Sequence, residues 1–206
     1  MERERSRSNL YALLSRILLQ ELDVEFIDRL KNDAAMLEFF PSLKEWDLFN
    51  ELDAATLLNE HINVDFVNIS LLHLTPYEGF YVRDDQMIET GGANPVTDYY
   101  SAYNFVVDFE KARVVAPDHI AIELEFMHTL VEAQIKAIDA GDDNIDDILS
   151  LQKEFLNKHL LQWVPMYLIS VKYESRTPLY HDAADMAIEF LLSDNEYLSQ
   201  TAKAVS

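Results

Sequence analysis

Apolar side chains recur every three or four positions along most of this chain, which is the spacing of helices that bury one face. The first such stretch covers about residues 8–22, and the second covers about 24–39 and ends at Pro41. The same spacing resumes near residue 43 and again over 54–74. The pattern therefore predicts helices along most of the first 74 residues.

The helical pattern breaks between residues 75 and 95. This stretch holds two prolines and three of the four glycines, Gly79, Gly91 and Gly92. A loop of roughly twenty residues is uncommon inside a compact domain and is usually functional or mobile. It begins with the aromatic residues Tyr77, Phe80 and Tyr81, which either pack into the core or form a binding surface.

Helical spacing returns in the second half of the chain. An aromatic-rich helix is predicted over 94–109, and another over 116–141 that stops at a glycine. A third is predicted over 145–163, which Pro165 should end or kink. A last helix starts at Thr177-Pro178, and the polar tail after Asp194 is expected to fray.

Composition agrees with a helical globular protein. Apolar residues make up 49% of the chain, and glycine occupies only four of the 206 positions. The length suffices for one domain with a full core, or for two small ones. We predict an all-α fold, a single compact helical domain over residues 1–206 with about eight or nine helices and a hinge near 141–144.

The charge of the chain disfavours several partners. Its 37 acidic and 16 basic residues give a formal net charge of −21. Nucleic acid and anionic membrane surfaces both require clustered Lys and Arg, so neither is an expected partner. A cationic ligand would be attracted to such an acidic surface. The same excess of acids is also typical of a solvated surface that binds nothing and is adapted to high salt.

The expected location is the cytoplasm. No apolar stretch is long enough to insert into a membrane, and residues 1–7 lack the features of a secretory signal. The chain has no cysteine, which excludes disulfides, thiolate metal sites and cysteine nucleophiles.

Three polar residues gather at the helix start that follows Pro117. His119 and Glu123 are four positions apart and share one helix face, while Asp118 lies in the first turn, where the helix dipole favours a carboxylate. This arrangement can keep the imidazole partly protonated or let it donate to a ligand carbonyl. It is also the pattern of a helix cap with a polar pair, and an acidic helical enzyme could use the same residues as a base.

Signatures of common active sites are missing from the sequence. Glu125-x-x-His128 has the spacing of a carboxylate metal site, but the second copy that such a site needs is absent. There is no Gly-x-Ser-x-Gly turn, and Gly91-Gly92 fits no phosphate-binding loop. We therefore expect no catalytic residue, no metal and no cofactor.

Six short segments, taken in order, resemble a known family. They are Arg7-x-x-x-Tyr11-x-x-Leu14, Asp65–Ile69, Pro76–Tyr81, Tyr100-x-x-x-Asn104-Phe105, Pro117–Phe126 and Phe155–Pro165. In this order they are similar to the TorD/DmsD/NarJ family of molybdoenzyme-specific chaperones. The resemblance extends over nearly the whole chain.

The resemblance implies an all-helical, non-catalytic protein of the cytoplasm. Such proteins bind the twin-arginine leader peptide, or the body, of the cofactor-free (apo) catalytic subunit of a molybdopterin oxidoreductase. They hold it until the molybdopterin guanine dinucleotide is inserted and then allow export, while some members serve reductases that are not exported. We expect a monomer, or a dimer formed by helix swapping through the turn at 141–144.

This chain departs from the family pattern at four positions. Asn68 and Ser70 stand where that family usually has Arg and Phe, which changes the polarity and shape of the wall there. Gly79 stands in place of Ser and should make the loop more flexible. Asn104 stands in place of Gly, an exchange that a left-handed backbone position tolerates.

A peptide-binding groove is the working hypothesis for the site. Aromatic and aliphatic side chains would hold the apolar stretch of the leader, Asp118 and Glu123 would attract its arginine pair, and His119 would orient it. The alternatives are an adaptor for a folded subunit and the acidic helical enzyme. The predicted peptide-binding residues are Phe66, Ile69, Pro76, Tyr77, Glu78, Phe80, Tyr81, Pro117, Asp118, His119 and Glu123.

Overall fold

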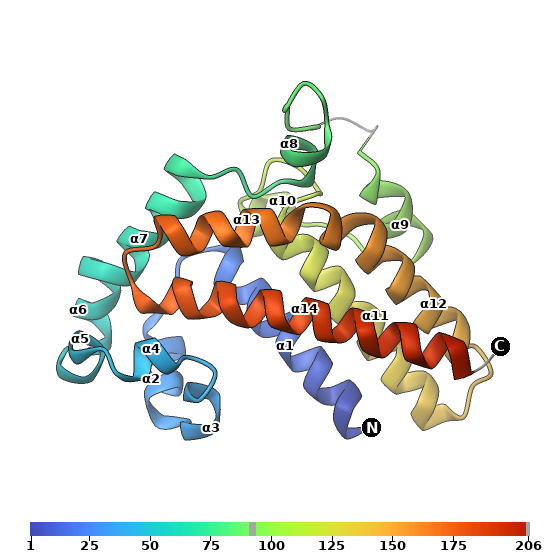
Figure 1. Cartoon of the computed structure of the whole chain (residues 1–206), viewed down its shortest axis with the longest axis horizontal. Helices are drawn as coiled ribbons and strands as arrows, with labels where there is room; N and C mark the ends of the chain where they lie inside the picture. The colour runs from blue at the N-terminus through green and yellow to red at the C-terminus, as the bar shows by residue number, and fades with distance from the viewer. Residues whose placement is uncertain (91–93, 205–206) are drawn as a thin grey trace. The chain divides into compact units, whose positions relative to one another are not determined.

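The computed structural model describes residues 1–90 and 94–204, and its regular structure is helical (Figure 1). Along these residues no strand forms, and an isolated β-bridge joins Tyr77 to His119. The all-α prediction is therefore confirmed. Gly91 and Gly92, which the sequence places in the long loop, lie outside the described residues.

The helices differ widely in length. The longer ones are α1 (Glu2–Leu19), α2 (Val24–Asn32), α9 (Val96–Ala102), α11 (Ile120–Ala140), α12 (Ile145–Phe155), α13 (Leu161–Glu174) and α14 (Pro178–Ala204). The short ones are α3 (Ala34–Leu37), α4 (Pro41–Lys44), α5 (Asp47–Glu51), α6 (Ala54–Leu57), α7 (Asn63–Val67), α8 (Glu78–Val82) and α10 (Phe109–Ala112). Three π-helical segments complete the set: η1 (Leu58–Ile62), η2 (Asn68–His73) and η3 (Leu156–Leu160).

Several of these elements follow one another without a break. The elements from α6 to η2 form one helical run, and those from α12 to α13 form another, so the described residues contain twelve continuous helical segments. This is more than the eight or nine expected. The additional ones are helices of four or five residues, which are too short to have a clear periodicity.

Capping explains where two predicted helices are divided. Asp33 accepts a hydrogen bond from the N–H of Met36 at 3.0 Å and so begins α3, which separates α2 from the residues after it. The aromatic-rich helix predicted through Phe109 stops at Ala102, because Asn104 adopts a left-handed backbone with φ of 54°. Asn104 thus has the left-handed backbone in which its exchange for Gly was expected to be tolerated.

Two helix ends differ from those that the sequence suggested. The helix does not end at Pro165, which lies inside α13 after the π-helical segment η3. Pro165 has no backbone N–H and so interrupts the hydrogen bonds of the helix, and a π-helical turn often accompanies such an interruption. The tail after Asp194 also remains helical to Ala204, because Leu198 is buried.

The chain divides into two compact units. Unit 1 comprises residues 1–19, 76–164 and 189–206, and unit 2 comprises residues 20–75 and 165–188. Gly141 ends α11 in a left-handed conformation with φ of 70°, as predicted for a helix C-terminus. The single domain with a hinge at 141–144 remains a prediction.

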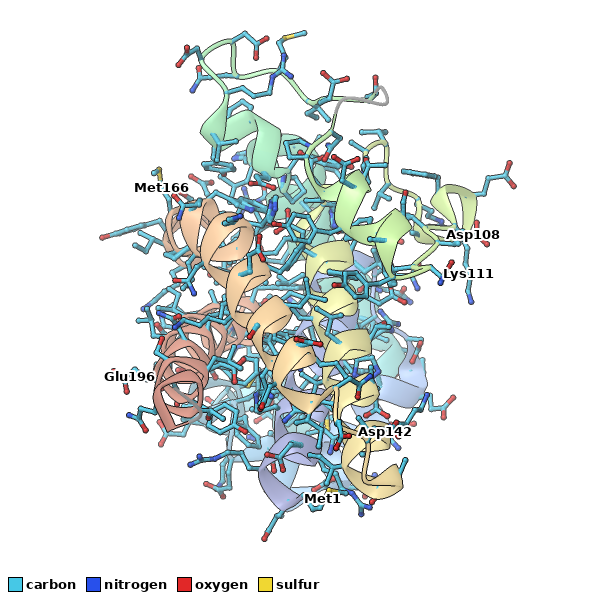
Figure 2. All side chains as sticks on the ribbon, turned by 90° about the vertical axis from the view of Figure 1, so that its right-hand side faces the viewer. Met1, Asp108, Lys111, Asp142, Met166 and Glu196 are labelled. Atoms are coloured by element: carbon cyan, nitrogen blue, oxygen red, sulfur yellow. The ribbon has the colours of Figure 1, made fainter. Side chains whose placement is uncertain are left out.

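Unit 1 has an aromatic core between its long helices. Helix α1 packs along α11, and α11 packs on α12 (Figure 1). Tyr11 is fully buried, and the rings of Phe126 and Phe155 meet edge to face at 4.8 Å. Figure 2 shows charged side chains such as Lys111 and Glu196 pointing away from the helices.

Unit 2 is organised around the helical run 54–73. The carboxylate of Asp65, which is buried, accepts the N–H of Arg176 at 2.9 Å and both the N–H and hydroxyl of Thr177 at 2.7 Å. Asp65 therefore fixes the start of α14 against this run. In neither unit is any described helix both long and apolar enough to cross a membrane.

Candidate functional site

Two of the segments singled out in the sequence lie against each other in unit 1. The N–H of Ile120 donates to the carbonyl of Pro76 at 2.9 Å, and the N–H of Glu78 donates to the carbonyl of Asp118 at 3.0 Å. These bonds flank the β-bridge between Tyr77 and His119. Backbone pairing thus brings residues 76–81 to residues 117–123 at the start of α11, as the groove hypothesis requires. The sequence predicted a loop over 76–81, but Glu78–Val82 form the short helix α8, so that part of the loop prediction is wrong.

Asp118 binds the backbone of the loop. It is almost fully buried, and its Oδ2 accepts the N–H of Gly79 at 2.7 Å. Its Oδ1 is buried and has no hydrogen-bond partner among the described residues. Burial raises the pKa of this carboxyl group, and the hydrogen bond from Gly79 opposes the rise. Asp118 is therefore a support for the loop.

His119 caps α11. Its Nδ1 accepts the N–H of Ala121 at 3.2 Å, and its ring meets that of Tyr77 edge to face at 5.0 Å. Burial lowers the pKa of the imidazole to about 3, so the ring is neutral near pH 7. The partly protonated histidine considered from the sequence is therefore wrong, and the helix-cap interpretation describes the geometry.

Glu123 is directed into the protein. It is fully buried, and the indole N–H of Trp163 donates to its Oε2 at 3.3 Å. Burial raises the pKa of this carboxyl group well above its usual value, and the nearby charges of Glu78 and Asp118 raise it further. A direct ion pair between Glu123 and a peptide arginine is therefore incompatible with this geometry.

A second buried histidine, His159, pairs with Glu78. Nδ1 of His159 lies 2.9 Å from Oε2 of Glu78, and the ring stacks on Phe155 at 4.8 Å. The partnership of His159 with Glu78 was not predicted from the sequence. The signal that could have found it is the shared membership of both residues in the six segments.

Two aromatic residues of the predicted set remain partly accessible. The ring of Tyr81 stacks on buried Trp163 at 5.3 Å, and Phe80 meets Tyr81 edge to face at 5.3 Å. Val82, which follows them, is exposed. We call Phe80, Tyr81 and Val82 the aromatic step. It is an apolar surface held by a buried polar cluster, namely Glu78, Asp118, His119, Glu123, His159 and Trp163.

The other predicted residues named below are buried in the fold. Pro76, Tyr77 and Pro117 are buried at the junction of the two segments. Phe66 and Ile69 belong to unit 2, where both are buried and Phe66 packs near the ring of Tyr180 at 6.2 Å. The structure thus brings nine of the eleven predicted residues together in unit 1.

The described residues contain no metal-binding arrangement. No group of three or more His, Asp or Glu side chains in residues 1–90 and 94–204 is placed to hold a metal ion. His128 instead has its Nδ1 2.9 Å from the hydroxyl of Ser8, while Glu125 is exposed.

Comparisons with known proteins agree with the resemblance of the six segments. The family model described as nitrate reductase delta subunit matches residues 30–168. The chain is 22% identical to the protein named chaperone protein TorD of Vibrio atlanticus and 24% identical to that of Aliivibrio fischeri, in each case over 94% of both chains. It is 25% identical to the perchlorate reductase assembly chaperone protein of Dechloromonas aromatica, over 73% of this chain and 63% of that protein. No solved structure matches.

Proposed function

This chain belongs to the nitrate reductase delta subunit family, and on that premise we propose that it is an assembly chaperone for the catalytic subunit of a molybdenum oxidoreductase. It is not an enzyme. The curated relatives support the proposal, because those that match over almost their whole length are named as chaperones. A reductase client is supported by the relative named for perchlorate reductase assembly.

The client is bound in the cytoplasm before its cofactor is inserted. Two parts of the client can be bound: its twin-arginine leader and the cofactor-free body of the catalytic subunit. The leader is the proposed ligand of unit 1. A subunit that is not exported would be bound through its body alone, and this is the alternative.

The observation that carries the site assignment is the aromatic step. Phe80 and Tyr81 are partly exposed, and hydrogen bonds and ring contacts hold the residues beneath them in place. A partly exposed aromatic surface with a rigid base suits the apolar stretch of a leader, since little side-chain freedom is lost on binding.

The arginine pair of the leader requires accessible acids. Asp118 and Glu123 are buried, so we assign them to support of the step. Asp84 is exposed, lies two residues after Val82, and has no ion pair among the described residues. Together with the net charge of −21, it supplies the attraction for the two guanidinium groups.

Calorimetric titration tests this assignment. Twin-arginine leader peptides from molybdenum enzymes of the same organism are titrated, each beside a control with two lysines in place of the arginines. We expect one leader to bind in the micromolar range or tighter, and its control to bind more weakly because lysine lacks the planar guanidinium fork. Binding of every leader and its control with equal affinity would contradict recognition of the arginine pair.

Variants test whether the leader binds at the aromatic step. Replacing Phe80 and Tyr81 by Ala together should weaken binding at least about tenfold, in keeping with the weight of aromatic residues at interfaces. Phe109→Ala, at an exposed aromatic residue of the same unit outside the step, is the matched control and should leave binding unchanged. If the double variant binds like the unmodified protein, the leader lies elsewhere.

A further inference from the structure

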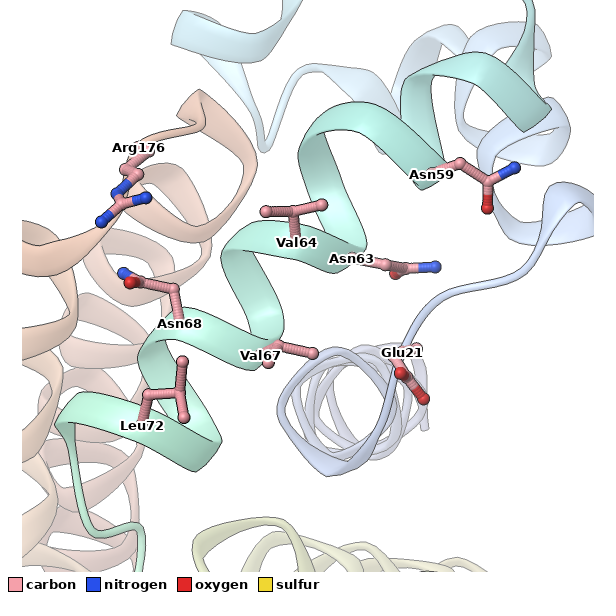
Figure 3. A pocket seen from close by; sticks show the side chains of 8 residues that line it. All are labelled: Glu21, Asn59, Asn63, Val64, Val67, Asn68, Leu72 and Arg176. Carbon is pink, nitrogen blue, oxygen red and sulfur yellow. The ribbon is translucent and has the colours of Figure 1, made fainter.

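A cavity of about 470 Å³ opens along the helical run of unit 2 (Figure 3). Its volume is in the range of sites for small ligands or short peptide segments. Val64, Val67 and Leu72 give it an apolar wall, and Val64 and Leu72 are largely exposed. The wall lies on α7 and η2, and π-helical turns such as η2 recur at functional sites.

An unsatisfied hydrogen-bond donor lines this cavity. Asn68 is only 6% exposed, and its amide nitrogen has no partner among the residues that the structure describes. A buried amide group without a partner costs free energy, which an acceptor atom of a ligand would recover. Figure 3 shows the Asn68 amide on the side of η2 where Arg176 lies.

Arg176 supplies a positive charge at the same place. Its backbone N–H is held by both carboxylate oxygens of Asp65, at 3.0 and 2.9 Å, so the main chain is fixed. Its guanidinium makes no ion pair within the described part of the chain. An anchored arginine beside a free amide donor is a suitable pair for the planar carboxylate group.

The charge around the cavity limits the ligand to one negative group. One guanidinium balances one carboxylate, and a nucleotide or polyphosphate would leave several charges unbalanced on a chain of net charge −21. Glu21 lines the cavity on another side in Figure 3 and repels a second anion. The apolar wall accommodates an aliphatic side chain next to the carboxylate.

We infer that this cavity binds a peptide segment that carries one carboxylate beside an aliphatic side chain. The source of the segment, the mature part of the client subunit, rests on the proposed function, whereas the chemistry of the cavity does not. Its ligand is anionic and that of the aromatic step is cationic. The chaperone would thus hold its client through two separate sites, one in each unit.

Nuclear magnetic resonance titration of the full chain with synthetic probes tests the inference. The probe is acetyl-Ala-Leu-Asp-Leu-Ala-amide, and its matched control has Asn in place of Asp. We expect the Asp peptide to bind at least about tenfold more tightly, because a hydrogen bond to a charged group is the stronger kind. The side-chain amide signals of Asn68 should shift during the titration.

Two variants separate charge at the cavity from charge in general. Arg176→Gln should remove the preference for Asp, and its exposed side chain makes it compatible with folding. Arg29→Gln removes an exposed arginine of unit 2 that does not line the cavity, and should bind like the unmodified protein. Retention of the Asp preference in Arg176→Gln, or equal binding of the two peptides, would overturn the inference.

Two further experiments test what kind of ligand the cavity binds and whether the two sites act independently. Isovalerate, a small acid of the same chemistry, should bind more weakly than the Asp peptide; equal affinity would make this a small-acid site and overturn the peptide assignment. Arg176→Gln should retain leader binding, and loss of leader binding would refute two separate sites. The synthetic probes are independent of any client, so failure of the leader titration leaves this test intact.

Discussion

Arg7 is a charged residue in the interior of unit 1. Its guanidinium pairs with Asp194 and donates to the side chains of Gln134 at 3.0 Å and Gln152 at 2.7 Å. The hydroxyl of Tyr11 donates to the same aspartate at 2.7 Å. The first of the six segments therefore contributes a buried polar network that binds α1 to the C-terminal half of α14.

Removal of one partner from this network should be costly. Asp194→Asn leaves the Arg7 charge buried without a counter-ion, and the free energy of unfolding should fall by about 3–5 kcal/mol. The double variant Arg7→Met, Asp194→Leu should lose less, because no buried charge remains. Urea unfolding measures both. Lys44→Gln, which breaks an exposed pair with Glu38, is the control and should lose little stability. An equally small loss in Asp194→Asn would contradict the role of the buried network.

His119 should make the folded protein sensitive to mild acid. In the unfolded chain this histidine gains a proton as the pH falls through about 6.5, the ordinary pKa of an imidazole, whereas burial lowers its pKa in the folded protein to about 3. The stability that the neutral ring contributes is therefore complete above pH 6.5 and is lost as the pH falls toward 3. The slope is at most about 1.4 kcal/mol per pH unit for one proton.

The variant His119→Asn tests this linkage, because Asn also caps a helix but does not titrate. Urea unfolding between pH 7 and about 5 should show the variant gaining on the unmodified protein as the pH falls. His73→Asn, at an exposed histidine, controls for the loss of an imidazole. A constant difference across this range would show that the folded protein does not keep His119 neutral.

At the scale of single residues, the sequence picked out residues that the fold brings together in unit 1, but it could not show their contacts. Asp118, His119 and Glu123 are recognisable as polar residues at a helix start. Spacing cannot show that Glu123 meets Trp163, since these residues are 40 positions apart and approach only in the folded unit. The roles that depend on burial could therefore not be predicted.

Helix α8 depends on a close backbone approach at Gly79. A Cβ atom at this position would lie 3.1 Å from Oδ2 of Asp118 and 3.2 Å from the carbonyl oxygen of Met87. Gly79 thus has a steric reason to be glycine, besides the flexibility expected from the sequence. The hydrogen bond from its N–H to Asp118 also holds the first turn of α8.

Gly79→Ala should loosen this element. We expect a loss of about 1–3 kcal/mol, typical of overpacking, with faster amide hydrogen exchange in residues 78–83. Gly141→Ala is the control, because a Cβ there meets no atom within 4 Å and strains only the left-handed end of α11. If both variants leave exchange in α8 unchanged, the close approach is unimportant.

At the scale of elements, periodicity predicted the long helices and missed the local devices that divide them. The Asp23 cap of α2 and the glycine end of α11 follow familiar residue preferences. The start of α11 does not, because the helix begins at Ile120 behind a His119 cap and not at residue 116 as expected. The π-helical segments have no periodic signature, since one extra residue per turn changes the register without changing composition. For this reason periodicity could not show whether Pro165 ends the helix or lies within it.

The whole molecule carries an excess of acids, which should repel one another. At low ionic strength this repulsion opposes folding of a chain with a net charge of −21, and salt screens it. The midpoint of urea unfolding should therefore rise between low salt and about 0.5 M sodium chloride. A midpoint that does not change with salt would mean that the acids are balanced locally.

The division into units is the part of the architecture that the sequence could not show. Unit 1 draws on three separate stretches of chain and unit 2 on two, and two of the boundaries lie inside α13 and α14. No linker composition marks these two boundaries, because a continuous helix passes each of them. The family, in contrast, was recognisable from six short segments in order.

The most direct test of the chaperone assignment is the affinity of the purified chain for the client catalytic subunit, measured by calorimetry in its cofactor-free and cofactor-loaded forms. An assembly chaperone must distinguish the two, so we expect tight binding of the cofactor-free subunit and weak or no binding of the loaded one. Equal affinity for both forms, or no binding to either, would contradict it.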